Sequence, residues 1–312
     1  MSLLRKLEMA VDFSTSEKLI ATYILKNGPD VLNMSTSQLA KATYTSPATI
    51  TRLCQKLEYK GYNDFKIALS AQLQYTFDRN SETNPNFPFK KRDTIHTIKH
   101  SIATLAKDSI NLTVNNIDND ILAKIIIMLD QAKVIDIYGV SGPLRIASDF
   151  QYKMFRIGKN VQIAPMVNEQ LFQAAQSNKD HCAILISYSG ETNEVIAAAE
   201  LLKRRKVPMI AITSFGESRL SKLCDYVLFL DSRERIYSKV STFGSTISIH
   251  IMLDIIYSCL FARHYDENLE LKLETDHIID HRHILFFSFH KLMIVPIILT
   301  QHIPHNKLHH QF

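Results

Sequence analysis

Short apolar segments that alternate with helical segments limit the fold of this chain more than any other feature of its sequence. Four such segments can be recognised, at 133–142, 181–190, 207–214 and 225–230. Between them the apolar residues have helical spacing, as in TNEVIAAAELLKRRK at 192–206. Strands that alternate with helices form a parallel sheet covered on both faces. The pattern therefore predicts an α/β domain, closed by a long helix near 241–263.

Serine and glycine are concentrated in the turns that follow the first two predicted strands. A phosphate dianion needs several donors that converge without bulky side chains, and a helix N-terminus adds free N–H groups and a favourable dipole. Ligands of open α/β sheets also bind at the carboxyl ends of the strands. Helix capping explains either turn alone, but two such turns in one sheet favour a phosphate site. Its candidate residues are Gly139, Ser141, Ser187, Ser189, Gly190 and Thr192.

Nearer the amino end, residues 37–57 have the spacing of two short helices joined by a tight break. Ser46 is the predicted N-cap of the second helix, and Pro47 suits its first turn. Three apolar residues recur at three- and four-residue spacing and predict a buried stripe. They are Ile50, Leu53 and Leu57. This arrangement is typical of a helix-turn-helix unit.

The opposite face of the second helix is polar. In a helix-turn-helix unit this helix enters the major groove, where small residues allow close approach and basic residues reach bases or phosphates. The candidate DNA contacts are Ser46, Ala48, Thr49, Thr51, Arg52, Lys56 and Lys60. An ordinary three-helix packing unit is the alternative. Tyr44 takes the turn position where Gly is usual, and because a positive φ is disfavoured for tyrosine, a different turn geometry is expected.

Composition along the chain predicts four parts. They are a helical domain at 1–77, a polar linker at 78–92, the α/β domain at 93–283 and an atypical tail at 284–312. In the first part, Ser16 is the predicted N-cap of a helix that Asn27-Gly28-Pro29 ends. The tail is apolar and then rich in histidine, but it has no acidic or cysteine partners for these histidines. We therefore expect no metal site there and no cofactor elsewhere.

Charge and cysteine content favour a protein of the cytoplasm. The net charge of +5 permits an anionic partner without requiring one. The four cysteines do not form CxxC pairs and are expected to be reduced thiols. Because the first residues include acidic side chains and no uncharged apolar run reaches about 18 residues, neither a signal peptide nor a membrane span is expected.

The sequences LAKATYTSPATITRLCQKL and ISYSGETNEV together resemble the RpiR (MurR/RpiR) regulators, over about residues 3–282. The resemblance implies an all-α helix-turn-helix domain followed by an α/β SIS (sugar isomerase) domain with a five-stranded parallel sheet flanked by helices. It also implies a homodimer or homotetramer in which Ser187, Ser189 and Thr192 contact the phosphate of a sugar effector, with Ser141 on the sugar or phosphate side. The family's first turn more often reads Gly-x-Gly-x-Ser, whereas this chain has Gly139-Val140-Ser141-Gly142-Pro143.

Two classes of function are compatible with a phosphate-binding α/β domain. A sugar-phosphate isomerase needs a general base beside the sugar carbons, and the spacing of the available Glu and His residues marks none of them as that base. Those residues are Glu169, Glu191, Glu194 and His250. A DNA-reading domain serves no purpose in a metabolic isomerase. We therefore expect a regulator of sugar metabolism genes that binds operator DNA and a phosphosugar, and not an enzyme.

Overall fold

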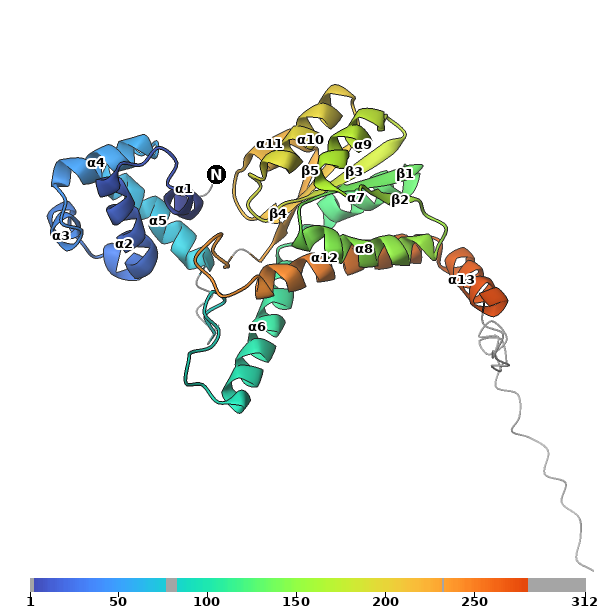
Figure 1. Cartoon of the computed structure of the whole chain (residues 1–312), viewed down its shortest axis with the longest axis horizontal. Helices are drawn as coiled ribbons and strands as arrows, with labels where there is room; N and C mark the ends of the chain where they lie inside the picture. The colour runs from blue at the N-terminus through green and yellow to red at the C-terminus, as the bar shows by residue number, and fades with distance from the viewer. Residues whose placement is uncertain (1–2, 77–82, 232, 280–312) are drawn as a thin grey trace, which may run out of the picture. The chain divides into compact units, whose positions relative to one another are not determined.

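The computed structural model describes residues 3–76, 83–231 and 233–279. Five helices form its amino-terminal part (Figure 1). They are α1 (Leu3–Met9), α2 (Thr15–Val31), α3 (Thr36–Ala42), α4 (Pro47–Lys56) and α5 (Tyr62–Thr76). Their apolar residues recur at helical spacing and share one core. Its fully buried members include Leu7, Ile20, Ile24, Leu39, Ile50, Leu53, Phe65 and Leu69.

Helix α2 differs from its predicted start and end. Ser14, and not Ser16, is the N-cap: its Oγ accepts from the Glu17 N–H at 3.3 Å, and the Glu17 carboxylate accepts from the Ser14 N–H at 2.7 Å. This capping box gives hydrogen-bond acceptors to the backbone N–H groups of Ser14 and Glu17. The helix therefore begins two residues earlier than a cap at Ser16 would place it. The predicted break is a kink at Asn27 (φ −122°, ψ 29°), after which the helix resumes with Pro29 in its first turn and continues to Val31.

A single parallel sheet follows in the second part of the chain. Its strands are β1 (Val134–Tyr138), β2 (Val161–Ile163), β3 (His181–Ile186), β4 (Met209–Ser214) and β5 (Tyr226–Leu230), in the order β2-β1-β3-β4-β5. Ile135 of β1 lies opposite Val161 of β2 and Cys182 of β3, the central strand. The expected five-stranded parallel sheet is confirmed. The sequence pattern alone marked four of the strands, because β2 is three residues long and partly exposed at the sheet edge.

Helices cover both faces of this sheet (Figure 1). They are α6 (Ile95–Asn115), α7 (Asn119–Gln131), α8 (Gly142–Phe155), α9 (Gln170–Gln176) after a 3-10 turn at Val167–Glu169, α10 (Asn193–Arg204), α11 (Arg219–Leu223) and α12 (Phe243–Arg263). Helices α6, α7, α8 and α12 pack on one face, and α9, α10 and α11 on the other. A further helix, α13 (Tyr265–Ile279), follows. The predicted tail 284–312 lies outside the described residues.

Helix α12 is the one described helix that is long and apolar enough, by length and composition, to cross a membrane. It contacts α6, α7, α8 and β5, and its buried residues belong to the core of the sheet domain. Those residues include Ile249, Met252, Leu253, Ile256 and Leu260. The packing identifies α12 as a core helix of this domain.

Tyr44 occupies the left-handed conformation that usually selects glycine. Its φ is +54°, and its side chain is 97% exposed. The Thr45 N–H donates to the Ala40 carbonyl at 2.9 Å, which is the closing bond of a Schellman motif at the end of α3. The different turn geometry expected from Tyr44 is therefore wrong: the turn keeps its glycine-like backbone, because capping the carbonyls of α3 outweighs the strain.

Replacing Tyr44 with glycine should stabilise the helical domain by about 1 kcal/mol. The left-handed conformation strains an L-residue by about 1–2 kcal/mol, and glycine relieves this strain. Part of the gain is lost, because glycine gives up more conformational entropy on folding. The exposed ring contributes little packing that could be lost. Thermal unfolding of Tyr44→Gly measures the gain. Tyr44→Ala, which keeps the Cβ, is the matched control, and an equal gain in both variants would contradict the strain.

Candidate functional site

The strand order places a topological switch point at the carboxyl ends of β1 and β3. The chain leaves β1 toward β2 on one side, while β3 leads to β4 on the other, so the connections diverge between these two neighbouring strands. Such a switch point is where open α/β sheets bind ligands. The turn 139–142 leads from β1 into α8, and the turn 187–192 leads from β3 into α10. The two predicted serine turns are thus adjacent.

The turn after β3 gathers three hydroxyl groups. Ser187 is 3% exposed. Its hydroxyl accepts from the Gly190 N–H at 3.1 Å and shares a hydrogen bond of 2.8 Å with the Thr192 hydroxyl. The Ser189 hydroxyl accepts from the Glu191 N–H at 3.1 Å. Thr192 is the N-cap of α10, but its side chain makes no capping bond. The first turn of α10 therefore keeps N–H groups that its N-cap side chain does not satisfy.

Residues of α11 and its N-cap contact the same turn. Gly190 has φ +65°, and its carbonyl accepts from the Leu220 N–H at 3.1 Å. A Cβ at this position would lie 2.2 Å from the Ser218 Oγ. The Glu191 carboxylate accepts from the Arg219 backbone N–H and Nε, both at 2.9 Å. These contacts fix the turn in one conformation, so its hydroxyls are preorganised.

The turn after β1 is strained at Ser141. This residue has φ +59° and ψ −114°, it is the N-cap of α8, and its side chain makes no capping bond. Such a backbone conformation costs about 1–3 kcal/mol in a residue other than glycine. Ser141 thus stands where the Gly-x-Gly-x-Ser pattern has its second glycine, and Pro143 stands at the place of the pattern's serine.

Gln170 is a part of this site that the sequence did not indicate. Its amide is 1% exposed; Nε2 donates to the Gly139 carbonyl at 2.7 Å, and Oε1 accepts from the Gly139 N–H at 3.2 Å. This two-point contact orients the peptide at the start of the first turn. Only the fold brings residues 31 positions apart together here, and a single glutamine at the start of α9 carries no local signal.

The four candidate bases lie on different elements, with Glu191 inside the turn 187–192 and Glu194 just after it. Glu191 is paired with Arg219, Glu169 precedes α9 as its N-cap, and Glu194 is exposed in the first turn of α10. His250 lies in the middle of α12. Of the two candidates beside the turn after β3, Glu191 is thus held by Arg219, and Glu194 is exposed.

The predicted DNA-reading helix is α4, and its cap is as expected. The Ser46 Oγ accepts from the Thr49 N–H at 3.2 Å, and the Arg52 guanidinium donates to the Thr49 hydroxyl at 3.3 Å. Ser46, Ala48, Arg52, Lys56 and Lys60 are exposed, whereas Thr49 and Thr51 are partly exposed. The Thr51 hydroxyl bonds back to the Pro47 carbonyl. Six of the seven predicted residues thus lie on α4 or at its N-cap, and Lys60 lies in the turn between α4 and α5.

Lys56 is held within the helical domain. Its ammonium lies 3.0 Å from the Glu17 carboxylate, donates to the Asp12 carbonyl and stands 5.5 Å from the centre of the Phe13 ring. Burial opposes ionisation of Glu17, but the Ser14 N–H and Lys56 together hold the pKa of its carboxyl below its ordinary value. These contacts join α4 to the start of α2, beside a hollow of about 580 Å³ that Arg52 also lines.

Two known sequence families match the chain. The helix-turn-helix domain of the rpiR family matches residues 1–76, and the SIS domain matches residues 128–260. The chain belongs to the RpiR family. This order of domains confirms the resemblance seen in residues 39–57 and 186–195. It also agrees with the helical core around α4 and with the parallel sheet that carries the serine turns.

Relatives of known sequence match this RpiR protein over most of their length. An uncharacterised HTH-type transcriptional regulator of Caldanaerobacter subterraneus subsp. tengcongensis is 29% identical over 277 residues, which cover 89% of this chain and 96% of the relative. One from Haemophilus influenzae is 28% identical, covering 85% and 91%. The solved structure of Vibrio vulnificus NanR in complex with ManNAc-6P is 29% identical, covers 89% of this chain and 98% of NanR, and superposes with a TM-score of 0.57.

Proposed function

We propose that this RpiR protein is a transcriptional regulator of sugar metabolism genes that binds operator DNA through α4 and a phosphosugar through its SIS domain. The observation that carries the proposal is the pair of turns at the switch point. Both lead into helices whose N-cap side chains, Ser141 and Thr192, make no capping bond. In contrast, Ser14, Ser35, Ser46, Thr94, Asp118 and Ser218 each cap their own helix. The N-caps Glu169 of α9 and Thr242 of α12 also make no side-chain capping bond, but neither follows a strand of the switch point.

In the proposed complex the phosphate lies against the start of α10. The hydroxyls of Ser187, Ser189 and Thr192 and the N–H groups beside Gly190 donate to its oxygens. The Ser187–Thr192 hydrogen bond shows that these two hydroxyls already point toward each other. Gly139 and Ser141 line the sugar side, where the strained Ser141 peptide can approach the ligand closely. N-acetylmannosamine 6-phosphate is the first ligand to test, because the similar NanR was solved with it.

The proposed domains are the helix-turn-helix domain at 1–77, a linker at 78–92 and the SIS domain at 93–283, acting in the cytoplasm as a homodimer or homotetramer. An operator with two-fold symmetry is bound by two helix-turn-helix domains, which a dimer supplies. Residues 78–82 of the linker lie outside the described residues. Helix α4 and the phosphate site belong to different domains. The effector must therefore act by having different affinities for two arrangements of the oligomer.

The double variant Ser187→Ala/Ser189→Ala tests the effector site. Each alanine deletes one donor without adding bulk, so the ligand response should be lost while operator binding without ligand is kept. Coupling of this kind is typically worth about 5- to 150-fold in affinity. Operator affinity is measured by fluorescence anisotropy with and without sugar phosphate. Ser148→Ala, which removes an exposed hydroxyl bonded to the Leu144 carbonyl, is the control.

A double variant that responds fully would place the phosphate elsewhere, and one that loses DNA binding without ligand would show that the serines only shape the fold. The second candidate function, a sugar-phosphate isomerase, rests on the same hydroxyl-bearing turns. It is tested by incubating the protein with a panel of sugar phosphates. Product formation would support the isomerase and contradict a purely regulatory role.

Mutation of the three basic residues on or near α4 should change operator affinity and its salt dependence in different ways. Arg52→Ala should weaken specific binding by about 1–3 kcal/mol if Arg52 reads a base. Lys60→Ala should remove one contact with a DNA phosphate. The slope of log K for operator binding against log salt concentration, called the salt slope below, should then become shallower by about one unit. Lys56→Met should weaken binding without lowering the slope, because its charge is paired with Glu17 and serves to position α4.

Operator titrations over a range of salt concentrations separate these effects. Glu17→Gln is the matched control, since it should reproduce the loss caused by Lys56→Met from the other side of the ion pair. A salt slope that falls by one unit in Lys56→Met, with Glu17→Gln unchanged, would assign Lys56 to a DNA phosphate.

A further inference from the structure

Helix α6 presents two imidazole rings on one side of its first turns. His96 and His100 are four residues apart, so they lie on the same face of the helix. Their Nε2 atoms are 3.1 Å apart, and the ring centres are 4.3 Å apart with a tilt of 53°. Both side chains are exposed. The two rings therefore converge on one point at the protein surface.

The separation of the two nitrogens suits one bound metal ion. A Zn–N bond is about 2.0–2.1 Å long. Two imidazole nitrogens on one tetrahedral ion are therefore ~3.3 Å apart, and two adjacent ones on an octahedral ion ~3.0 Å. The observed 3.1 Å lies between these values. An ion can thus replace the hydrogen bond at nearly the same Nε2–Nε2 separation, once each ring turns its lone pair toward the ion.

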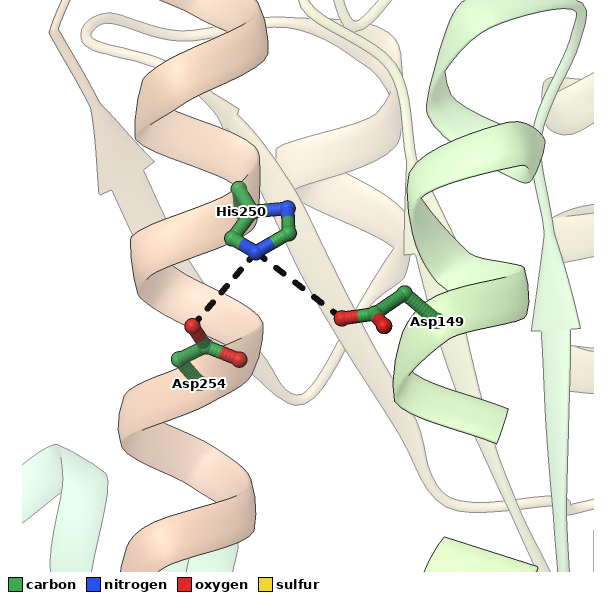
Figure 2. Close-up of side chains that lie close together, drawn as sticks. All are labelled: Asp149, His250 and Asp254. Atoms are coloured by element: carbon green, nitrogen blue, oxygen red, sulfur yellow. Dashed lines mark ion pairs between the residues drawn. The ribbon is translucent and has the colours of Figure 1, made fainter. Parts of the chain in front are cut away.

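A second cluster in the chain has the ligand types of a metal site but already contains a cation. Figure 2 shows His250 between Asp149 of α8 and Asp254 of α12, with Nε2 at 3.8 Å and 3.5 Å from their carboxylates. The Lys153 ammonium lies 2.7 Å from Asp149 and 2.5 Å from Asp254. It neutralises the two carboxylates and ties α8 to α12. Within the described part of the chain, no ion pair involves His96 or His100.

We propose that His96 and His100 bind a divalent first-row transition-metal ion such as Zn²⁺, Ni²⁺ or Cu²⁺, with water as the remaining ligands. Neutral imidazole suits these ions, and their affinities for a nitrogen site rise toward Cu²⁺. An ion held by residues four apart links successive turns of the helix. Since it binds the folded turns and not the unfolded ones, it stabilises the beginning of α6 by mass action.

Hydrogen–deuterium exchange of the full-length protein tests this site locally. With Zn²⁺ at 100 times its Kd, local opening of the first turns of α6 should be about 100-fold rarer, so their amides should exchange correspondingly more slowly. EDTA should reverse the effect. A local readout is needed because the chain holds 13 histidines, several of them in the tail.

The matched control is the swap His100→Ser/Ser101→His. It keeps the composition but places the rings five residues apart, on different faces of the helix. Metal-free exchange of the swap variant checks that α6 is still folded. Slower exchange with Zn²⁺ in the wild type alone would support the site. Equal protection in both proteins, or no protection in the wild type at saturating Zn²⁺, would overturn it.

Discussion

Replacing Gly190 with alanine should abolish phosphosugar binding and destabilise the SIS domain by about 2–5 kcal/mol. Two effects add here. A left-handed L-residue costs about 1–2 kcal/mol, and overpacking a closed site costs about 1–3 kcal/mol. The new Cβ would lie 2.2 Å from the Ser218 Oγ and 2.5 Å from the Ser218 Cβ, so the turn or α11 must move. Either movement separates the Ser187, Ser189 and Thr192 hydroxyls from their common point.

Two further variants separate the causes. Gly61→Ala is the control, because a Cβ there meets nothing within 4 Å. Gly190→Ala/Ser218→Gly removes the two contacts with Ser218 but keeps the strained φ and the approach to Thr213 Oγ1 at 3.0 Å. It should recover most of the steric part of the loss, less the few tenths of a kcal/mol, roughly, that replacing the α11 N-cap with glycine costs. Ligand binding is measured by calorimetry and stability by thermal unfolding. Full ligand affinity in Gly190→Ala would show that the turn after β3 does not hold the phosphate.

Replacing Asp231 with alanine should destabilise the SIS domain by about 3–5 kcal/mol, the usual effect of leaving a buried charge without its partner. Asp231 follows β5 and accepts from Arg233 through Nε at 3.0 Å and Nη2 at 2.8 Å, and from the Ser109 hydroxyl at 3.1 Å. Arg233 is 4% exposed, so water cannot replace the lost carboxylate. Asp108, at 3.6 Å, is the remaining acidic partner.

The pair can be replaced as a unit to check this reasoning. Asp231→Leu/Arg233→Met removes both charges, and it should recover much of the stability that Asp231→Ala loses. Urea unfolding followed by a probe in the SIS domain measures both variants. A loss of less than 1 kcal/mol in Asp231→Ala would mean that Asp108 or water compensates the guanidinium.

Local patterns predicted the parts of the fold that depend on neighbours in sequence. Apolar runs of five or six residues marked β1, β3, β4 and β5, whereas the three residues of β2 were too few to mark a strand. The cap at Ser46 was predictable because serine followed by proline has few other local roles. The cap at Ser14 was missed, because two further serine or threonine residues follow it and the deciding contact comes from Glu17.

Contacts between distant residues were outside the reach of sequence patterns. The serine turns were predicted because hydroxyls, glycine and a helix start lie within six residues. Gln170 and Lys56 were not assigned their contacts, since Gly139 and Glu17 approach them only in the folded chain. At Tyr44 the residue type predicted the wrong conformation. A tyrosine disfavours a left-handed turn, but the hydrogen bonds that end α3 hold its backbone in that conformation.

The burial of α12 has a consequence for how the protein is made. This helix is apolar enough to be attractive to a membrane, and a newly made chain emerges from the ribosome one residue at a time. Its packing partners α6, α7, α8 and β5 all precede it in the chain. Chains are synthesised at about 5–20 residues per second, so all four partner segments have left the ribosome's active centre seconds before the end of α12 is made. Every segment that buries the most apolar described helix is thus available to it as soon as that helix has been synthesised.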